Sequence, residues 1–275
     1  MKFGRYEITL PNHGFFRLDG GAMFGAVPKN LWARSMPADS ENCIRLATRS
    51  LLLKDGERNI LVDVGNGNKW SEKLAKIFGI ENTPEGELGF SRDEITDIIL
   101  THLHFDHAGG ISYYTDSGEL ALSYPSARMY LQRSNFENGK NPNLREKASY
   151  LANHINILEE GKLELLDGDG EVLPDIFVKR VDGHTIGQQY LEIRSDHDTI
   201  LYPTDLCPTS HHLPLPYNMG YDMCTKTLLE EKEAFLSYAV EKNAIVVFEH
   251  DPELAAARIH IDDRGHYGVK EEVSF

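Results

Sequence analysis

The sequence predicts one α/β domain that spans residues 1–275, and three observations support this prediction. Short runs rich in β-branched residues, which favour strands, recur along the whole chain. Stretches with apolar residues at helical spacing lie between them. No linker rich in Pro, Gly or Ser divides the chain. Strands that alternate with helices in this way, without a break, are typical of a single α/β domain.

The first clear strands form a predicted β-hairpin. Two apolar runs, 45–53 and 59–64, flank the segment Lys54-Asp55-Gly56-Glu57-Arg58. Its Asp-Gly dipeptide is one that tight hairpin turns favour. Further strands are predicted at residues 98–101, 128–131, 176–181, 189–193, 199–202 and 244–248.

Three stretches show helical periodicity. Residues 227–242 are the clearest, because their apolar residues recur near every 3.6 positions beneath an acidic face. We interpret that acidic face as a solvated surface. Residues 144–159 and 70–78 are the other two predicted helices.

Two apolar stretches, 20–32 and 203–216, are too rich in Gly or Pro for a regular helix or strand. Each is therefore predicted to be a loop. An apolar loop either folds back onto the core or lines a pocket for an apolar substrate, and the sequence leaves both open. The candidates for such a pocket are Met23, Phe24, Trp32, His211 and His212.

The composition argues against several classes of protein for this chain. With 28 Lys and Arg against 43 Asp and Glu, the net charge is −15, which would repel a nucleic acid. No run of 18 apolar residues is present, and the first residues lack the apolar segment of a secretory signal. We therefore expect a cytoplasmic protein with no membrane partner. Three scattered cysteines are too few for a disulfide framework.

A dense cluster of potential metal ligands follows the predicted strand 98–101. His102, His104, Asp106 and His107 fall within six positions, a pattern expected by chance roughly 0.0015 times in such a chain. Neutral imidazoles suit zinc, and a carboxylate both binds a cation and offsets its charge. Residues i and i+2 of an extended segment point the same way, so the first two histidines can chelate one ion. A following turn aims the last two residues at a second ion.

Further ligands are expected at the ends of later strands, because four side chains do not complete two metal sites. Three later predicted strands are followed by such residues, namely His184, Asp205 and His250. In an open α/β sheet, strand ends that share one edge bring their side chains together. The sequence therefore predicts a site for two metals.

The cluster, the Gly183-His184-Thr185-x-Gly187 box, Asp205 and His250 together resemble the metallo-β-lactamase superfamily, over most of the chain. The resemblance implies a four-layer αββα sandwich with the active site at one edge of the two sheets. It assigns His102, His104 and His184 to one metal. Asp106, His107 and His250 are assigned to the second, and Asp205 bridges both together with a water. It also implies that Asp63, near the site, supports the ligands.

The stretch from Gly21 to Lys29 further resembles quorum-quenching lactonases and enzymes similar to methyl parathion hydrolase. Two positions depart from the family pattern. Ile186 stands where Pro is common in the His184 box, which affects the stiffness of the turn more than ligation. Pro208 stands where one lactonase group has a tyrosine near the substrate carbonyl, which weakens the substrate assignment but not the metal assignment.

The resemblance implies a hydrolase that attacks a lactone or another ester of a small, partly apolar substrate with a hydroxide that bridges two metals. The metals are expected to be zinc, with Mn, Fe and Co left open. Coordination brings the pKa of water from about 15.7 to about 7. Asp106 is predicted to be catalytic, since it can accept the proton of that water and pass it to the leaving group.

Two alternatives share this fold. One is a phosphotriesterase-like enzyme or a thioester hydrolase of the glyoxalase II type. The other is a di-iron redox or binding protein that uses the same ligands. The expected partner is a small-molecule substrate. The apolar N-terminal stretch also suits a dimer interface, which leaves a homodimer open.

Overall fold

The computed structural model describes residues 1–275, and the chain divides into two compact units. The first unit holds residues 1–15, 48–168 and 275, and the second unit holds residues 16–47 and 169–274. The single domain over residues 1–275 stays a prediction.

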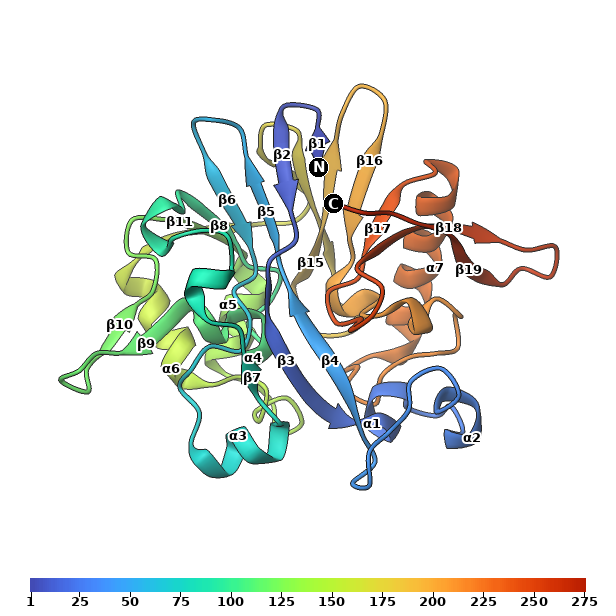
Figure 1. Ribbon diagram of the computed structural model, residues 1–275, viewed down its shortest axis with the longest axis horizontal. Coiled ribbons are helices and arrows are strands. Elements are labelled where there is room, and N and C mark those ends of the chain that lie inside the picture. The colour runs from blue at the N-terminus through green and yellow to red at the C-terminus, as the bar shows by residue number, and fades with distance from the viewer. The chain divides into compact units, whose positions relative to one another are not determined.

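A seven-stranded sheet forms the core of the first unit (Figure 1). The predicted hairpin is confirmed, because β5 and β6 pair antiparallel with Leu52 opposite Leu61. From β6 onward, β8, β11 and β12 pair parallel to their neighbours. In sheet order the strands are β1 (Lys2–Phe3), β2 (Tyr6–Thr9), β5 (Leu51–Lys54), β6 (Asn59–Val62), β8 (Asp97–Ile99), β11 (Arg128–Gln132) and β12 (Lys162–Leu166). A separate hairpin joins β9 (Ser112–Tyr114) and β10 (Leu120–Leu122).

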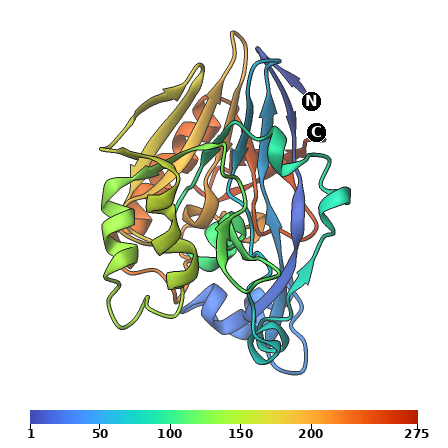
Figure 2. The ribbon, with the colours of Figure 1, turned by 90° about the vertical axis from the view of Figure 1, so that its left-hand side faces the viewer.

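Short helices accompany this sheet, with α5 and α6 drawn in green to yellow in Figure 2. Phe136 of α5 and Ile155 of α6 pack with Ile98 and Leu131 of the sheet in one apolar core. The helix predicted over residues 144–159 is wrong for its first half, where Asn143 accepts hydrogen bonds from the backbone of residues 145 and 146 and turns form instead. The helices are α3 (Glu72–Phe78), α4 (Phe105–Ala108), α5 (Arg133–Lys140) and α6 (Ala152–Ile155).

A second seven-stranded sheet forms the core of the second unit. Its pairs are antiparallel except β16 with β17, which is parallel and needs a crossover connection. α7 (Thr225–Glu241) lies within that connection and buries Leu228, Phe235 and Leu236 against the sheet (Figure 1). The helix predicted at 227–242 is thus confirmed. The strands are β13 (Gly170–Leu173), β14 (Ile176–Val181), β15 (Gln188–Arg194), β16 (Thr199–Tyr202), β17 (Ile245–Val247), β18 (Ala256–Ile261) and β19 (Tyr267–Glu272).

The stretch 20–32 is not the predicted loop, because it forms two short helices, α1 (Gly20–Phe24) and α2 (Lys29–Trp32). The Asp19 side chain caps α1 by accepting a hydrogen bond of 2.8 Å from the backbone N–H of Ala22. A Cβ at Gly20 would lie 2.4 Å from the Trp32 ring, so glycine at this position permits close packing. The helices follow β3 (Asn12–Asp19), which forms a small sheet with β4 (Cys43–Arg49) and β7 (Glu81–Asn82).

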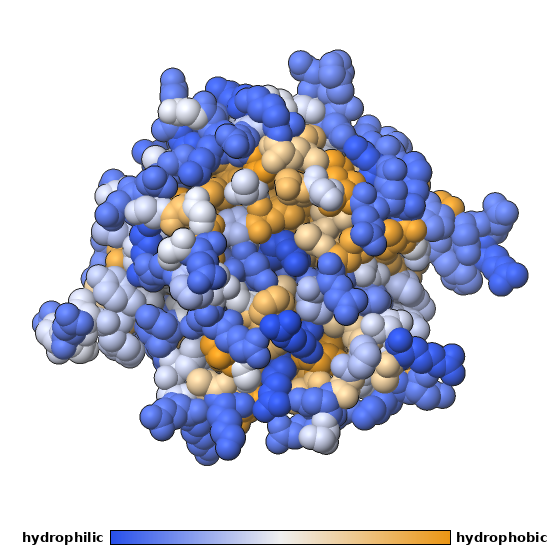
Figure 3. Space-filling view, viewed as in Figure 1, coloured by the Kyte–Doolittle hydropathy of each residue, from blue (hydrophilic) through white to orange (hydrophobic).

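Polar and charged residues cover most of the face drawn in Figure 3, in keeping with the high content of acidic residues. No helix of the chain has both the length and the apolar character that a membrane crossing requires. All three cysteines are free thiols.

Candidate metal centre

The first unit carries four of the predicted ligands on the segment that follows β8. His102 lies in irregular backbone, His104 has an extended conformation, and α4 begins directly after it at Phe105, so Asp106 and His107 lie on the first turn of the helix. All four side chains are buried. The ligand atoms of His102 and His104 lie within 4.8 Å of each other, as do those of Asp106 and His107. These are the two pairs that the sequence pattern predicts, and their role as metal ligands stays a prediction.

Asp63, which follows β6, is buried behind this segment. One of its carboxylate oxygens accepts hydrogen bonds from the Thr101 hydroxyl at 2.7 Å and lies 3.0 Å from His107 Nδ1. The other oxygen accepts a 2.8 Å bond from the backbone N–H of Thr101. Because Asp63 engages Nδ1, Nε2 is the nitrogen of the His107 ring that can act as a metal ligand.

Two side chains that the sequence did not single out as functional hold the same segment from the other side. The Asn135 amide oxygen accepts a 2.9 Å bond from the backbone N–H of Leu103, and His154 Nε2 lies 3.1 Å from the Leu103 carbonyl. Burial lowers the pKa of His154 to about 3, so its neutral ring donates to that carbonyl. Nothing in the local sequence marks either residue, since they lie 32 and 51 positions from Leu103, whose backbone they contact.

The second unit brings together the other three predicted ligands. Asp205 follows β16, and its two carboxylate oxygens lie 3.0 Å from His184 Nε2 and 3.2 Å from His250 Nε2. All three side chains are buried. A carboxylate that faces the Nε2 atoms of two imidazoles is a donor set that suits a divalent cation.

Both histidines of this group are held through Nδ1. His184 Nδ1 lies 2.9 Å from Asp222, and His250 Nδ1 lies 2.7 Å from the carbonyl oxygen of Ala47. Burial alone would lower the pKa of His184, but the carboxylates of Asp205 and Asp222 outweigh it and raise the pKa to about 10. The negative charge that raises this pKa also favours a bound cation.

Asp222 is a residue of the candidate site that the sequence pattern did not predict. Its second carboxylate oxygen accepts a 2.7 Å bond from the backbone N–H of Met219, which fixes its orientation toward His184. Burial raises its pKa. A carboxylate that supports a metal-binding histidine is a common arrangement, but no sequence spacing identifies it here.

Four of the five predicted pocket residues form a buried cluster in the second unit. The Phe24 ring stacks on Trp32 at 5.3 Å and on His212 at 4.6 Å between ring centroids. His212 Nε2 lies 2.9 Å from the carbonyl oxygen of Met23. His211 is partly exposed. Contact of these residues with a substrate stays a prediction.

Comparisons with known proteins place this chain among metal-dependent hydrolases. The family model of the metallo-beta-lactamase superfamily matches residues 44–250. An N-acyl homoserine lactonase of Bacillus cereus is 25% identical over 232 residues, which cover 77% of this chain and 84% of the relative. The solved structure of a probable metal-dependent hydrolase from Staphylococcus aureus is 28% identical, covers 100% of both chains and has a TM-score of 0.87. AidC, a dizinc quorum-quenching lactonase in complex with the product N-hexanoyl-L-homoserine, is 21% identical, with a TM-score of 0.80 over 100% of this chain and 97% of its own.

Proposed function

Because this chain belongs to the metallo-β-lactamase superfamily, we propose that it is a dinuclear metal hydrolase that opens a lactone or cleaves another ester of a small, partly apolar molecule. The predicted α/β fold class and the prediction of a metal-dependent hydrolase are confirmed by the family match and by the Staphylococcus aureus structure. The observation that carries the proposal is the buried Asp205 carboxylate, which faces Nε2 atoms of both His184 and His250. The lactonase relative supports the substrate class.

Two divalent metals fit the buried imidazoles and carboxylates of the chain, and we propose zinc as the metal. His102, His104 and His184 would hold one ion, and Asp106, His107 and His250 the second. Asp205 would contact both ions. The family model, which runs through both units from residue 44 to residue 250, supports this assignment.

When bound, the two ions would supply a water of lowered pKa and polarise the oxygen of the substrate carbonyl. Residues of the chain itself would orient the ligands and transfer the proton. Asp63, Asp222 and the Ala47 carbonyl orient the imidazoles through Nδ1. The Asp106 carboxylate is proposed to accept a proton from the attacking water and to pass it to the leaving alkoxide.

Metal analysis and a turnover panel test the proposal. The purified protein should contain two divalent ions per chain, and removal of the ions by a chelator should abolish turnover. The panel comprises an acyl-homoserine lactone, an aryl ester, a phosphotriester and a glutathione thioester, and we expect the lactone to be the best substrate. A phosphotriester turned over faster than the lactone would overturn the substrate class. An oxygen-reactive iron form that is inert to all four would overturn the hydrolytic role.

Cytoplasmic location also stays a prediction, which fractionation of the producing cells tests. Size-exclusion chromatography with light scattering tests whether a homodimer forms.

A further inference from the structure

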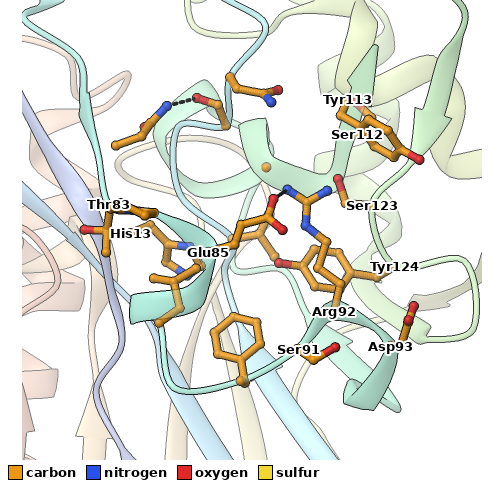
Figure 4. Close-up of a pocket in the computed structure, with 18 of the residues that line it drawn as sticks. His13, Thr83, Glu85, Ser91, Arg92, Asp93, Ser112, Tyr113, Ser123 and Tyr124 are labelled. Atoms are coloured by element: carbon orange, nitrogen blue, oxygen red, sulfur yellow. Dashed lines mark hydrogen bonds and ion pairs between the residues drawn. The ribbon is translucent and has the colours of Figure 1, made fainter. Parts of the chain in front are cut away.

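A cavity of about 720 Å³ lies within the first unit, and no predicted metal ligand lines it (Figure 4). Its walls come from the turn after β6, from the loop between β7 and β8, and from the β9–β10 hairpin with the residues that follow it. The volume lies within the range of small-molecule binding sites, about 300–1,000 Å³. The cavity is therefore a candidate for a binding site separate from the metal centre.

Close backbone packing builds one wall of this cavity. Gly65 has a φ of +66°, and a Cβ there would lie 2.7 Å from Cβ of His13, so glycine is required for His13 to pack against this turn. The backbone N–H of Thr83 donates a 2.9 Å hydrogen bond to the carbonyl of His13, which ties the loop between β7 and β8 to β3.

Two buried polar atoms of the cavity wall have no hydrogen-bond partner in the protein. They are the hydroxyl oxygen of Ser123, whose side chain is only 5% exposed, and Nε2 of His13. A buried polar atom without a partner costs free energy, about 1–3 kcal/mol in typical cases. A polar group of a ligand in the cavity would satisfy these atoms.

Arg92 is the cation of this cavity, as Figure 4 shows. Its guanidinium lies over the rings of Tyr113 and Tyr124, at 5.5 and 6.0 Å from their centroids, which limits its orientation. It pairs with the carboxylate of Glu85, whose side chain is 63% exposed. An exposed ion pair is weak, so another anion that is better shielded from water can replace Glu85.

Two of the remaining titratable groups of the wall, His13 and Tyr124, carry no charge at pH 7. Burial, aided by the charge of Arg92, lowers the pKa of His13 to about 4, so its ring is neutral at pH 7. Burial raises the pKa of Tyr124 to about 12, so its hydroxyl keeps its proton. Asp93 lines the cavity from an exposed position on the turn that carries Arg92. Phe90, Leu122 and Tyr124 supply apolar and aromatic surface.

We propose that this cavity binds a small aromatic carboxylate. The carboxylate replaces Glu85 at the Arg92 guanidinium and accepts a hydrogen bond from the Ser123 hydroxyl. The aromatic ring packs against Phe90, Leu122 and Tyr124. This site is independent of the proposed hydrolytic function, because it uses none of the metal ligands.

Isothermal titration calorimetry of the full-length, metal-loaded protein with 2-naphthoate tests the proposal, and 2-naphthamide serves as the neutral analogue. We expect naphthoate to bind at least tenfold more tightly than the amide. Arg92→Gln should weaken naphthoate binding by roughly tenfold or more, the size of a lost charge-assisted hydrogen bond. Glu85→Gln should strengthen binding, because it removes the competing carboxylate. Arg128→Gln is the matched control, since that exposed guanidinium of the same unit lies 3.6 Å from Glu164 and outside the cavity.

Circular dichroism and hydrolytic activity verify that each variant is folded. Equal affinities for naphthoate and naphthamide would overturn the proposal, and so would the absence of binding at millimolar naphthoate. If naphthoate binds at the metal centre instead, Arg92→Gln and Glu85→Gln will bind it with the same affinity as the unchanged protein. That result would also overturn the proposal.

Discussion

Three buried histidines of the predicted ligand set are held in the same way. Nδ1 of His107 lies beside Asp63, Nδ1 of His184 beside Asp222, and Nδ1 of His250 beside the Ala47 carbonyl. A carbonyl oxygen or a carboxylate can only accept a hydrogen bond, so in each ring Nδ1 carries a proton. Nε2, the atom that Asp205 faces in His184 and His250, is then the nitrogen that can bind a metal when it has no proton. These contacts prepare the imidazoles for metal binding.

Substitution of Asp222 tests this support. Asp222→Ala removes the acceptor of His184 Nδ1, and we expect the affinity for one metal to fall about 10–100-fold. Competition with a chromophoric chelator measures that affinity. Asp262→Ala, at an exposed turn of the same unit, is the control and should leave it unchanged. If Asp222→Ala binds both ions as tightly as the control, Asp222 does not support the metal centre.

Asp106→Asn tests the proton transfer. The amide cannot accept the proton of the attacking water, so we expect turnover of the lactone to fall by about 10²–10⁴-fold in protein that still holds two ions. Metal analysis of the same sample separates this effect from the loss of an ion. Asp116→Asn, an exposed residue of the same unit, should retain full turnover. Full turnover of Asp106→Asn with both ions bound would rule out its role as a proton acceptor.

The helix α7 and the α1–α2 segment hold the part of the second unit that carries Asp222. The Lys232 ammonium lies buried on α7 and donates to the carbonyls of Pro214 and Tyr217, at 3.1 and 2.9 Å. Burial lowers its pKa to about 8, since the ammonium has lost most of its water. Phe24 packs against His212 from the α1 side. The loop that presents Asp222 to His184 is therefore supported by a helix and by the N-terminal segment.

Phe24 should carry much of the stability of this arrangement. Its ring is fully buried between two other rings, so we expect Phe24→Ala to reduce the free energy of unfolding by about 3–5 kcal/mol. Leu31 of α2 is 43% exposed, and Leu31→Ala should change that free energy by less than about 1 kcal/mol. Urea unfolding followed by circular dichroism measures both. Similar losses for the two variants would contradict the packing described for Phe24.

Buried neutral histidines make the free energy of unfolding of this protein depend on pH. Burial lowers the pKa of His13 to about 4, and burial lowers the pKa of both His154 and His212 to about 3. In the unfolded chain these side chains bind protons below about pH 6.5. Between these values the unfolded state binds more protons than the folded state. Stability therefore falls as the pH falls, by about 1.4 kcal/mol per pH unit for each histidine.

The variant His212→Gln isolates one of these contributions. This variant should be less stable than the unchanged protein at pH 7 but should lose less stability as the pH falls. The slope of its free energy of unfolding against pH, between pH 6 and pH 4.5, should therefore be smaller by about 1.4 kcal/mol per pH unit. Urea unfolding at several pH values gives the slopes of both proteins. Acid release of metal from the other histidines affects both proteins equally and cancels in the difference. Equal slopes would show that His212 is not held neutral in the folded state.

Local spacing predicted the elements and the ligand segments. Three of these features depend on residues that lie close together in the chain, so local sequence patterns can predict them. They are the hairpin of β5 and β6, the helix α7 and the turn that separates His104 from Asp106. For the same reason the sequence predicted which ligands follow which strands. The helices at 20–32 were missed because their caps and close packing, at Asp19 and Gly20, offset the Gly and Pro content.

The sequence by itself determined the fold class and the metal-dependent chemistry, and it predicted the ligands, because a few residue types at short spacings specify them. Only the tertiary structure decided which side chains support those residues and where the cavity lined by Arg92 forms. Asp222 is 38 positions from His184, and Met23 is 189 positions from His212. Contacts between residues so far apart in the sequence form when folding packs remote segments together. No local sequence pattern predicts them.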